Sequence, residues 1–96
     1  MEKSSSQIVN EFLSTRDLWS LKDEKLHREY KFKDFTEAFG FMAMVAIVAE
    51  KTNHHPEWFN VYNKVVVDLT THEANGISER DFQLAVTMDE LAEKFS

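Results

Sequence analysis

The fold of this chain is decided by residues 34–49, which read DFTEAFGFMAMVAIVA. Asp34 lies three residues before Glu37, and this capping spacing predicts that a helix begins here. A core stripe is predicted at helical spacing, comprising Phe35, Ala38, Phe39, Met42, Val45, Ala46 and Ala49. Other apolar residues lie outside this stripe, namely Phe41, Met44, Ile47 and Val48. A helix that is apolar nearly all round must be covered on both sides.

One sheet can cover only one side of such a helix, so the second side needs another cover. We expect a second copy of the chain there, in a homodimer or homotetramer assembled through helix 34–53. The alternative is that an N-terminal helix covers the second side within one chain. Residues 5–15 are predicted to form that helix, because capping-box spacing precedes helical apolar periodicity.

Two hairpins are predicted, one before and one after the central helix. The first has strands near residues 18–21 and 26–32, with apolar and charged residues alternating in the second strand. The second hairpin has aromatic and β-branched strands at residues 58–62 and 65–71. Residues 63–64 are expected to form the turn between them.

A last helix begins after Ser78, whose spacing to Asp81 is again that of a capping box, and it carries apolar residues as far as Phe95. The order helix, two strands, helix, two strands, helix (α-β-β-α-β-β-α) predicts an α+β fold. We expect two layers, with a four-stranded antiparallel sheet and helices on one face of it. A single domain should span residues 1–96.

The composition excludes several kinds of site. The 96 residues include no cysteine, so thiolate metal sites, iron–sulfur clusters and cysteine nucleophiles are excluded. There are two glycines and no phosphate-binding glycine motif, and a net charge of −6 argues against nucleic acid as a direct partner. The longest apolar run, residues 38–49, is too short to cross a bilayer. No secretory signal is recognisable, so we expect no membrane partner and a cytoplasmic location.

Three histidines lie where predicted elements end, which is where sites are commonly built. His54 and His55 follow the central helix, and His72 follows the last strand. Glu50, four residues before His54, is expected to pair with it, and this carboxylate and the helix dipole both favour a charged imidazole. His54 is therefore a candidate proton donor. A structural role is the alternative, in which the histidines cap helix carbonyls and Asp81 serves only as the capping-box acid.

A metal site is a second alternative for the same residues. Glu50, His54 and His72 would make the two-histidine, one-carboxylate donor set of non-haem iron. No His-x3-His spacing occurs, so we predict a site without a metal ion. Proton transfer by imidazoles needs no metal, and metal analysis of the purified protein separates the two alternatives.

Residues 50–65, which read EKTNHHPEWFNVYNKV, resemble the pterin-4a-carbinolamine dehydratase family. The family pattern has an acidic or polar residue, three spacers, His-His-Pro and then an aromatic residue. Residues 33–42 and 71–81 extend the resemblance, and Trp19 stands where the family usually has a tryptophan. In all, the resemblance covers about residues 17–95.

The resemblance implies the same two-layer fold, assembly through the central helix and a small pterin substrate. It implies loss of water from 4a-hydroxytetrahydropterin to give the quinonoid dihydropterin, with no cofactor, in the recycling of tetrahydrobiopterin for aromatic amino acid hydroxylases. The catalytic residues that it implies are Glu50, His54, His55 and His72. The substrate-binding residues that it implies are His54, His55, Pro56, Thr71, His72, Glu73, Ala74 and, as an aromatic wall, Trp19, with Arg80 and Asp81 as supports.

We expect His54 and His72 to converge on one pterin-sized hollow and to exchange the roles of proton donor and acceptor. His55 would orient the ring, and Glu50 would act on His54. Which histidine donates is left open. Animal members of the family also act as dimerisation cofactors of a homeodomain transcription factor through the same helical surface. The alternative function is therefore that of a protein-binding transcriptional cofactor, acting through helix 34–53 and also located in the nucleus.

Overall fold

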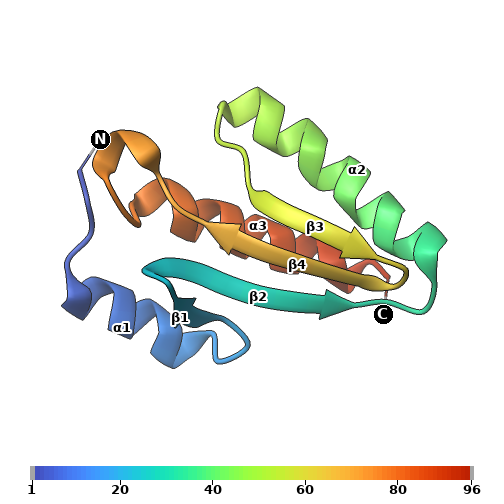
Figure 1. Ribbon diagram of the computed structural model, residues 1–96, viewed down its shortest axis with the longest axis horizontal. Helices are drawn as coiled ribbons and strands as arrows, with labels where there is room; N and C mark the ends of the chain where they lie inside the picture. The colour runs from blue at the N-terminus through green and yellow to red at the C-terminus, as the bar shows by residue number, and fades with distance from the viewer. Residues whose placement is uncertain (1, 96) are drawn as a thin grey trace.

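The computed structural model describes residues 2–95, and its elements follow the predicted order (Figure 1). Three α-helices, four strands and one short 3₁₀ helix are present in this part of the chain. In chain order they are α1 (Ser6–Thr15), β1 (Ser20–Lys22), β2 (Lys25–Lys31), α2 (Phe35–Thr52), β3 (Glu57–Val61), β4 (Lys64–Leu69), η1 (His72–Ala74) and α3 (Glu79–Glu93).

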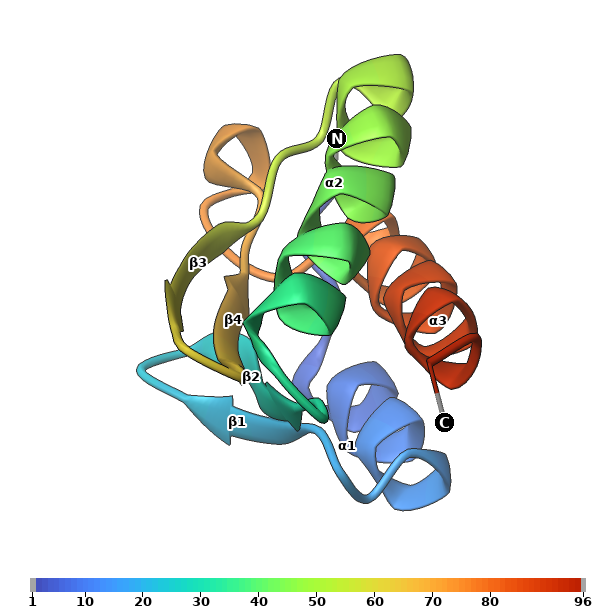
Figure 2. The same cartoon turned by 90° about the vertical axis from the view of Figure 1, so that its right-hand side faces the viewer.

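The four strands form one antiparallel sheet in the order β1-β2-β4-β3. All three α-helices lie on the same face of this sheet, as the side view shows (Figure 2). The predicted α+β architecture of two layers is therefore confirmed. None of the helices described here is long and apolar enough to span a bilayer.

The core lies between the sheet and the helices, because alternate residues of β2 and β4 point toward the helices. Tyr30 lies opposite Val65 and Leu26 lies opposite Leu69 in the strand register, and all four side chains are buried. Phe41 of α2 is also fully buried and packs against the ring of Tyr30, with 4.7 Å between the ring centroids. The central helix is thus fixed to the sheet by an aromatic contact.

The beginning of α2 agrees with the prediction, since the Asp34 side chain accepts a hydrogen bond of 2.9 Å from the Glu37 backbone N–H. The predicted core stripe was wrong in part. Phe41 is completely buried, whereas the side chains of Phe35 and Phe39 are 50% and 56% exposed. The buried residues of α2 are Ala38, Phe41, Val45 and Ala49. Several stripes fit a helix that is apolar nearly all round, and only packing on the sheet selects one of them.

The second face of α2 is not covered by the N-terminal helix, so that alternative was wrong. Phe12 of α1 instead packs on Phe82 of α3, with 4.7 Å between their ring centroids. On α2, Phe39 and Ile47 remain exposed, the latter at 71%. Within one subunit, an apolar face of α2 therefore stays in contact with solvent.

Both hairpins differ from their predicted boundaries by one or two residues. Trp19, expected in the first strand, precedes β1 and turns into the core, where 3% of it is exposed. In the second hairpin the turn is formed by Tyr62 and Asn63, because Val61 already pairs with Lys64. The Asn63 side chain donates to the Phe32 carbonyl over 2.9 Å, a tertiary contact that holds the turn in this position.

Candidate active site

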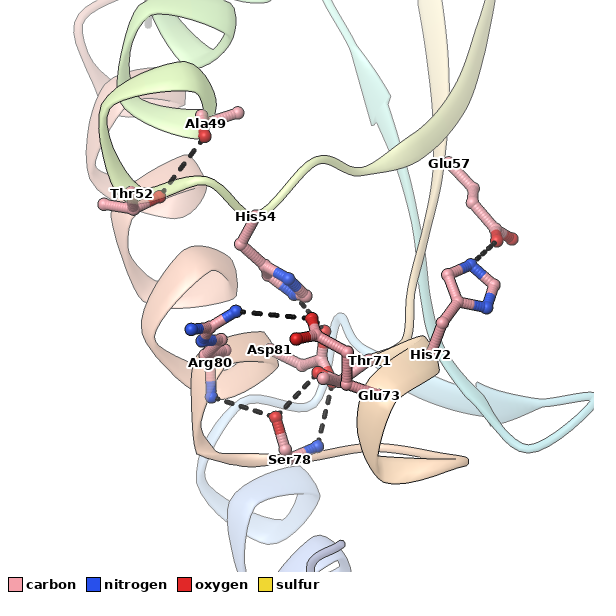
Figure 3. Close-up of polar contacts among 10 residues, drawn as sticks. All are labelled: Ala49, Thr52, His54, Glu57, Thr71, His72, Glu73, Ser78, Arg80 and Asp81. Atoms are coloured by element: carbon pink, nitrogen blue, oxygen red, sulfur yellow. Dashed lines mark hydrogen bonds and ion pairs between the residues drawn. The ribbon is translucent and has the colours of Figure 1, made fainter. Parts of the chain in front are cut away.

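A buried polar cluster lies where α2 ends and α3 begins (Figure 3). His54, Thr71, Ser78 and Asp81 form this cluster, and each is at most 8% exposed. His54 follows α2, Thr71 follows β4, and Ser78 and Asp81 belong to the first turn of α3. Three element ends thus meet in one buried place.

The end of α2 directs His54 into this cluster. Asn53 adopts the left-handed conformation (φ 54°, ψ 43°), and its N–H donates to the carbonyls of Ala49 and Glu50. The His54 N–H also donates to the Ala49 carbonyl, over 3.0 Å. The chain therefore turns back beneath the helix, and the imidazole points toward α3 (Figure 3).

Asp81 is the centre of the cluster. Its Oδ1 lies 2.6 Å from Nε2 of His54, and its Oδ2 accepts hydrogen bonds from the Thr71 hydroxyl at 2.8 Å and the Ser78 N–H at 2.9 Å. The hydroxyls of Thr71 and Ser78 also lie 2.6 Å apart. The capping box of Ser78 and Asp81 is confirmed, but Asp81 binds His54 as well.

This contact decides which nitrogen of His54 carries hydrogen. An ionised carboxylate can only accept a hydrogen bond, so Nε2 must be the donor. In the neutral ring Nδ1 is then the nitrogen without hydrogen, and it is the one that can accept a proton. The Asp81 carboxylate thus orients the ring and selects the tautomer of His54.

Glu50 does not pair with His54, contrary to the sequence-based expectation. Its Oε1 lies 3.0 Å from Nε2 of His55, and both side chains are exposed. The expectation assumed that helical periodicity continues to His54. The helix ends at Thr52, so the spacing of four residues no longer brings side chains onto one face.

His72 lies on η1, and its side chain is 83% exposed. Its Nε2 lies 3.3 Å from Oε2 of Glu57, a residue of β3 that sequence reasoning did not single out. Glu57 also accepts a hydrogen bond of 2.5 Å from Nζ of Lys25, and this bond is the main reason that the pKa of Glu57 is lowered. The position of Glu57 next to His-His-Pro was the only signal available in the sequence.

A second ion pair holds η1 from its other side. Nη1 of Arg80 lies 3.7 Å from Oε1 of Glu73, so Arg80 ties η1 to the first turn of α3 (Figure 3). Ala74 at the end of η1 is buried. The predicted support residues therefore lie beside the predicted binding segment, Arg80 through Glu73 and Asp81 through Thr71.

A hollow of about 220 Å³ lies beside His54, between α2 and α3. Its lining consists of Val48, Thr52, His54, Arg80, Gln83, Leu84 and Thr87. His72 does not line this hollow, and each of the two imidazoles is turned toward its own carboxylate (Figure 3). A hollow shared by the two rings stays a prediction.

Trp19 is not an aromatic wall of this cluster. Its indole N–H donates to Asp89 over 3.0 Å, within the core. Asp89 lies eight residues after Asp81 on α3, which is about 12 Å along a helix axis. The two carboxylates therefore serve separate groups of side chains, and Trp19 belongs to the other one.

The three residues of the metal-binding alternative, Glu50, His54 and His72, do not come together either. Glu50 bonds to His55, His54 to Asp81 and His72 to Glu57, so the three proposed donors have three different partners. Among residues 2–95, no three His, Cys, Asp or Glu side chains are grouped so that they could hold a metal ion. The side chains of the His54 cluster are hydrogen-bonded to one another.

The chain is similar to known proteins over nearly its whole length. The family described as pterin 4 alpha carbinolamine dehydratase matches residues 2–91. A provisionally named pterin-4-alpha-carbinolamine dehydratase from Solibacter usitatus is 56% identical over 90 residues, covering 94% of this chain and 95% of the relative. A relative of the same provisional name from Rhizobium meliloti is 49% identical over 94 residues, covering 96% of this chain and 90% of the relative.

The fold is also that of a solved protein. The crystal structure of a transcriptional coactivator/pterin dehydratase from Brucella melitensis superposes with a TM-score of 0.91 and 47% sequence identity. The match covers 95% of this chain and 99% of that one. Since sequence and fold agree over nearly the whole length, the chain belongs to the pterin 4 alpha carbinolamine dehydratase family.

Proposed function

We propose that this protein is a hydro-lyase that removes water from 4a-hydroxytetrahydropterin and releases the quinonoid dihydropterin. The observation that carries the proposal is the contact of 2.6 Å between His54 and the buried Asp81, within a chain that belongs to this family. Such a pair is suited to moving a proton to or from a bound molecule.

The reaction needs two proton transfers. The bond between carbon 4a and its hydroxyl oxygen breaks, and the oxygen leaves as water after it receives a proton. A ring nitrogen loses a proton, and its electron pair forms the new carbon–nitrogen double bond. No electrons are exchanged with another molecule, so one acid and one base complete the chemistry.

His54 and His72 supply the acid and the base in this proposal, on opposite sides of the pterin. Asp81 keeps hydrogen on Nε2 of His54, which leaves Nδ1 for the substrate. His55 orients the pterin ring. Glu50 holds the imidazole of His55, and not that of His54 as the sequence suggested. Pro56 and the backbone of residues 71–74 line the place where the ring binds.

Single histidine variants test this assignment. His54→Ala and His72→Ala should each lower the rate of dehydration of synthetic 4a-carbinolamine by about 100-fold or more, which is the usual contribution of an acid or base. His27→Ala is the control for the loss of an imidazole, because His27 is the one histidine of the chain outside the predicted site residues. Unchanged rates in both site variants, together with normal thermal unfolding, would contradict the catalytic assignment.

The cellular role follows from the same chemistry and is part of the proposal. The product would enter the recycling of tetrahydrobiopterin for aromatic amino acid hydroxylases, in the cytoplasm. A knockout that accumulates the carbinolamine, and that recovers when the gene is returned, supports this role. A knockout with unchanged pterins argues against it.

A second function, as a protein-binding transcriptional cofactor, is favoured by one specific observation. Phe35, Phe39 and Ile47 expose an apolar face of α2 that no element within residues 2–95 covers. The solved relative from Brucella melitensis is described as a transcriptional coactivator as well as a pterin dehydratase. We infer that this face binds a second copy of the chain, in a homodimer or homotetramer, and that a transcription factor would compete for it.

Capture experiments separate the two uses of the α2 face. Tagged protein should retain untagged copies of itself when both are expressed together, and Ile47→Lys should abolish that retention. Retention of a transcription factor, such as a homeodomain protein, by the unmodified chain and not by Ile47→Lys would support the cofactor role. Failure to retain either would argue against an interface on this face.

A further inference from the structure

The segment before α1 contacts the loop that carries the predicted substrate-binding residues. This loop, residues 71–77, is closed by two hydrogen bonds between Thr71 and Gly76: Thr71 N–H to Gly76 O at 2.9 Å and Gly76 N–H to Thr71 O at 3.3 Å. His72 and Glu73 lie inside the closed loop, on η1. The position of the loop therefore decides where these side chains lie.

Lys3 and Ser4 lie directly on the closing end of the loop. The Ser4 N–H donates to the Ile77 carbonyl over 2.8 Å. The stem of Lys3 covers Gly76 so closely that a β-carbon at this glycine would lie 2.8 Å from Cε and 3.1 Å from Cδ of the lysine. The blue N-terminal segment and the orange loop lie side by side in Figure 1.

The other end of this segment is anchored on the helical layer. Ser5 caps α1 by accepting the Ile8 N–H over 3.2 Å, and Val9 in the next turn is buried. Phe12 then packs on Phe82 of α3, one residue after Asp81. The segment therefore joins the loop to the same helix that carries the centre of the His54 cluster.

Thr71 anchors the start of the loop through its buried hydrogen bonds to Asp81 and Ser78. The side-chain contacts of η1, inside the loop, are weaker. His72 pairs with Glu57 at 3.3 Å and Glu73 pairs with Arg80 at 3.7 Å, and both histidine and glutamate side chains are mostly exposed. Exposed ion pairs contribute little to the stability of a conformation, because water screens the charges and the side chains lose entropy when they pair. The hydrogen bond from Ser4 and the stem of Lys3 act on the backbone of the loop itself.

We propose that Lys3 and Ser4 are positioning residues that hold loop 71–77 in the conformation that binds the pterin. The inference rests on the proposed function, since it concerns the backbone that would receive the substrate. Neither residue touches the reacting atoms in this proposal. Loss of these two contacts should raise the KM for the substrate far more than it lowers kcat.

Two variants remove the two contacts, and each has a matched control. Ser4→Pro removes the donor N–H, whereas Ser6→Pro places proline at the first position of α1, where helices accept it. Lys3→Gly removes the stem that covers Gly76, whereas Lys3→Met keeps a stem of similar length without charge. All four variants keep Ser5, so the cap of α1 is intact.

Ser4→Pro and Lys3→Gly should raise the KM for 4a-carbinolamine by about three- to tenfold, the factor that corresponds to one net hydrogen bond or small packing contact, with kcat within about twofold of the unmodified protein. Hydrogen exchange of the Gly76 and Ala74 amides should accelerate in the same two variants. Ser6→Pro and Lys3→Met should match the unmodified protein in both measurements.

Equal exchange rates in Ser4→Pro and Ser6→Pro would overturn the proposal, and so would a fall in kcat with no change in KM. Lys3→Met behaving as Lys3→Gly would overturn the role of the stem. If the unmodified protein does not dehydrate the substrate, the proposed function fails, while hydrogen exchange still decides whether Lys3 and Ser4 hold the loop.

Discussion

The exchange of Asp81 for asparagine is the sharpest test of the His54 cluster. Asparagine has the same shape, and its carbonyl oxygen can still accept from Thr71 and from the Ser78 N–H. Its amide group would face His54 in place of Oδ1, and an amide nitrogen can only donate. Nε2 of His54 must then become the acceptor, so the hydrogen of the neutral ring moves to Nδ1. Asp81→Asn therefore inverts the tautomer of His54 without removing a side chain.

The expected cost to stability is small. Three hydrogen bonds to a buried carboxylate become bonds to a neutral amide, and each such change costs about 0.5–1 kcal/mol. The total of about 1.5–3 kcal/mol is below the 5–15 kcal/mol that usually stabilises a domain, so the variant should fold. Urea unfolding measures this loss of free energy directly.

The expected cost to activity is much larger. In the asparagine variant Nδ1 carries hydrogen in the neutral ring, so Nδ1 can neither accept a proton from the pterin nor be left without hydrogen after donating one. Dehydration should slow by about 100-fold or more, in line with the loss of an acid–base group. Steady-state assays with synthetic 4a-carbinolamine measure the rate, and nitrogen NMR of the imidazole reports the tautomer.

Asp34→Asn is the control, because Asp34 caps the beginning of α2, at the opposite end of the helix from His54, and asparagine is also a good N-cap. It should leave the rate unchanged. The reasoning about His54 is refuted if Asp81→Asn shows the inverted tautomer and still dehydrates the substrate at the unmodified rate.

Three further predictions concern pH, the second carboxylate cluster and assembly. The pKa of Glu57 is lowered chiefly by its hydrogen bond from Lys25, so the pair stabilises the fold fully above the ordinary glutamate pKa of 4.5. This stabilisation is lost as the pH falls through the lowered pKa. Lys25→Met should therefore reduce the dependence of urea unfolding on acid pH, and an unchanged dependence would contradict the prediction. Burial and the hydrogen bond to Asp89 raise the pKa of Tyr30, so its contribution is complete below about pH 10 and is lost only as the pH rises above that. Tyr30→Phe should lower the free energy of unfolding at neutral pH by about 1–3 kcal/mol, because the Asp89 carboxylate loses one hydrogen-bond donor. The rate of dehydration should not change. Equal stability of the variant would show that this hydrogen bond contributes nothing. Ile47→Lys should lower the molar mass seen by light scattering without changing thermal unfolding of the subunit, and an unchanged mass would exclude this face of α2 as the interface.

Much of the site could be anticipated from the chain, since His54, Thr71, His72 and Asp81 are all recognisable by their motifs. Their partners could not. Asp81 was expected to act as a cap, and the structure adds His54 to it across 27 residues of sequence. Glu57 carries no motif of its own, and its contact with His72 depends on how β3 lies beside η1.

The sequence by itself determined the order of elements and the places where helices begin, because a cap such as Asp34 to Glu37 joins residues three apart and needs no distant partner. Only the tertiary structure decided which side of α2 is buried and which carboxylate meets His54. An apolar helix fits several stripes equally well, and the sheet chooses Phe41 over Phe39. The pairing of Glu50 with His54 was predicted from helical periodicity, which ends at Asn53 because this residue adopts the left-handed conformation. The chain then turns toward α3, and His54 meets Asp81 there.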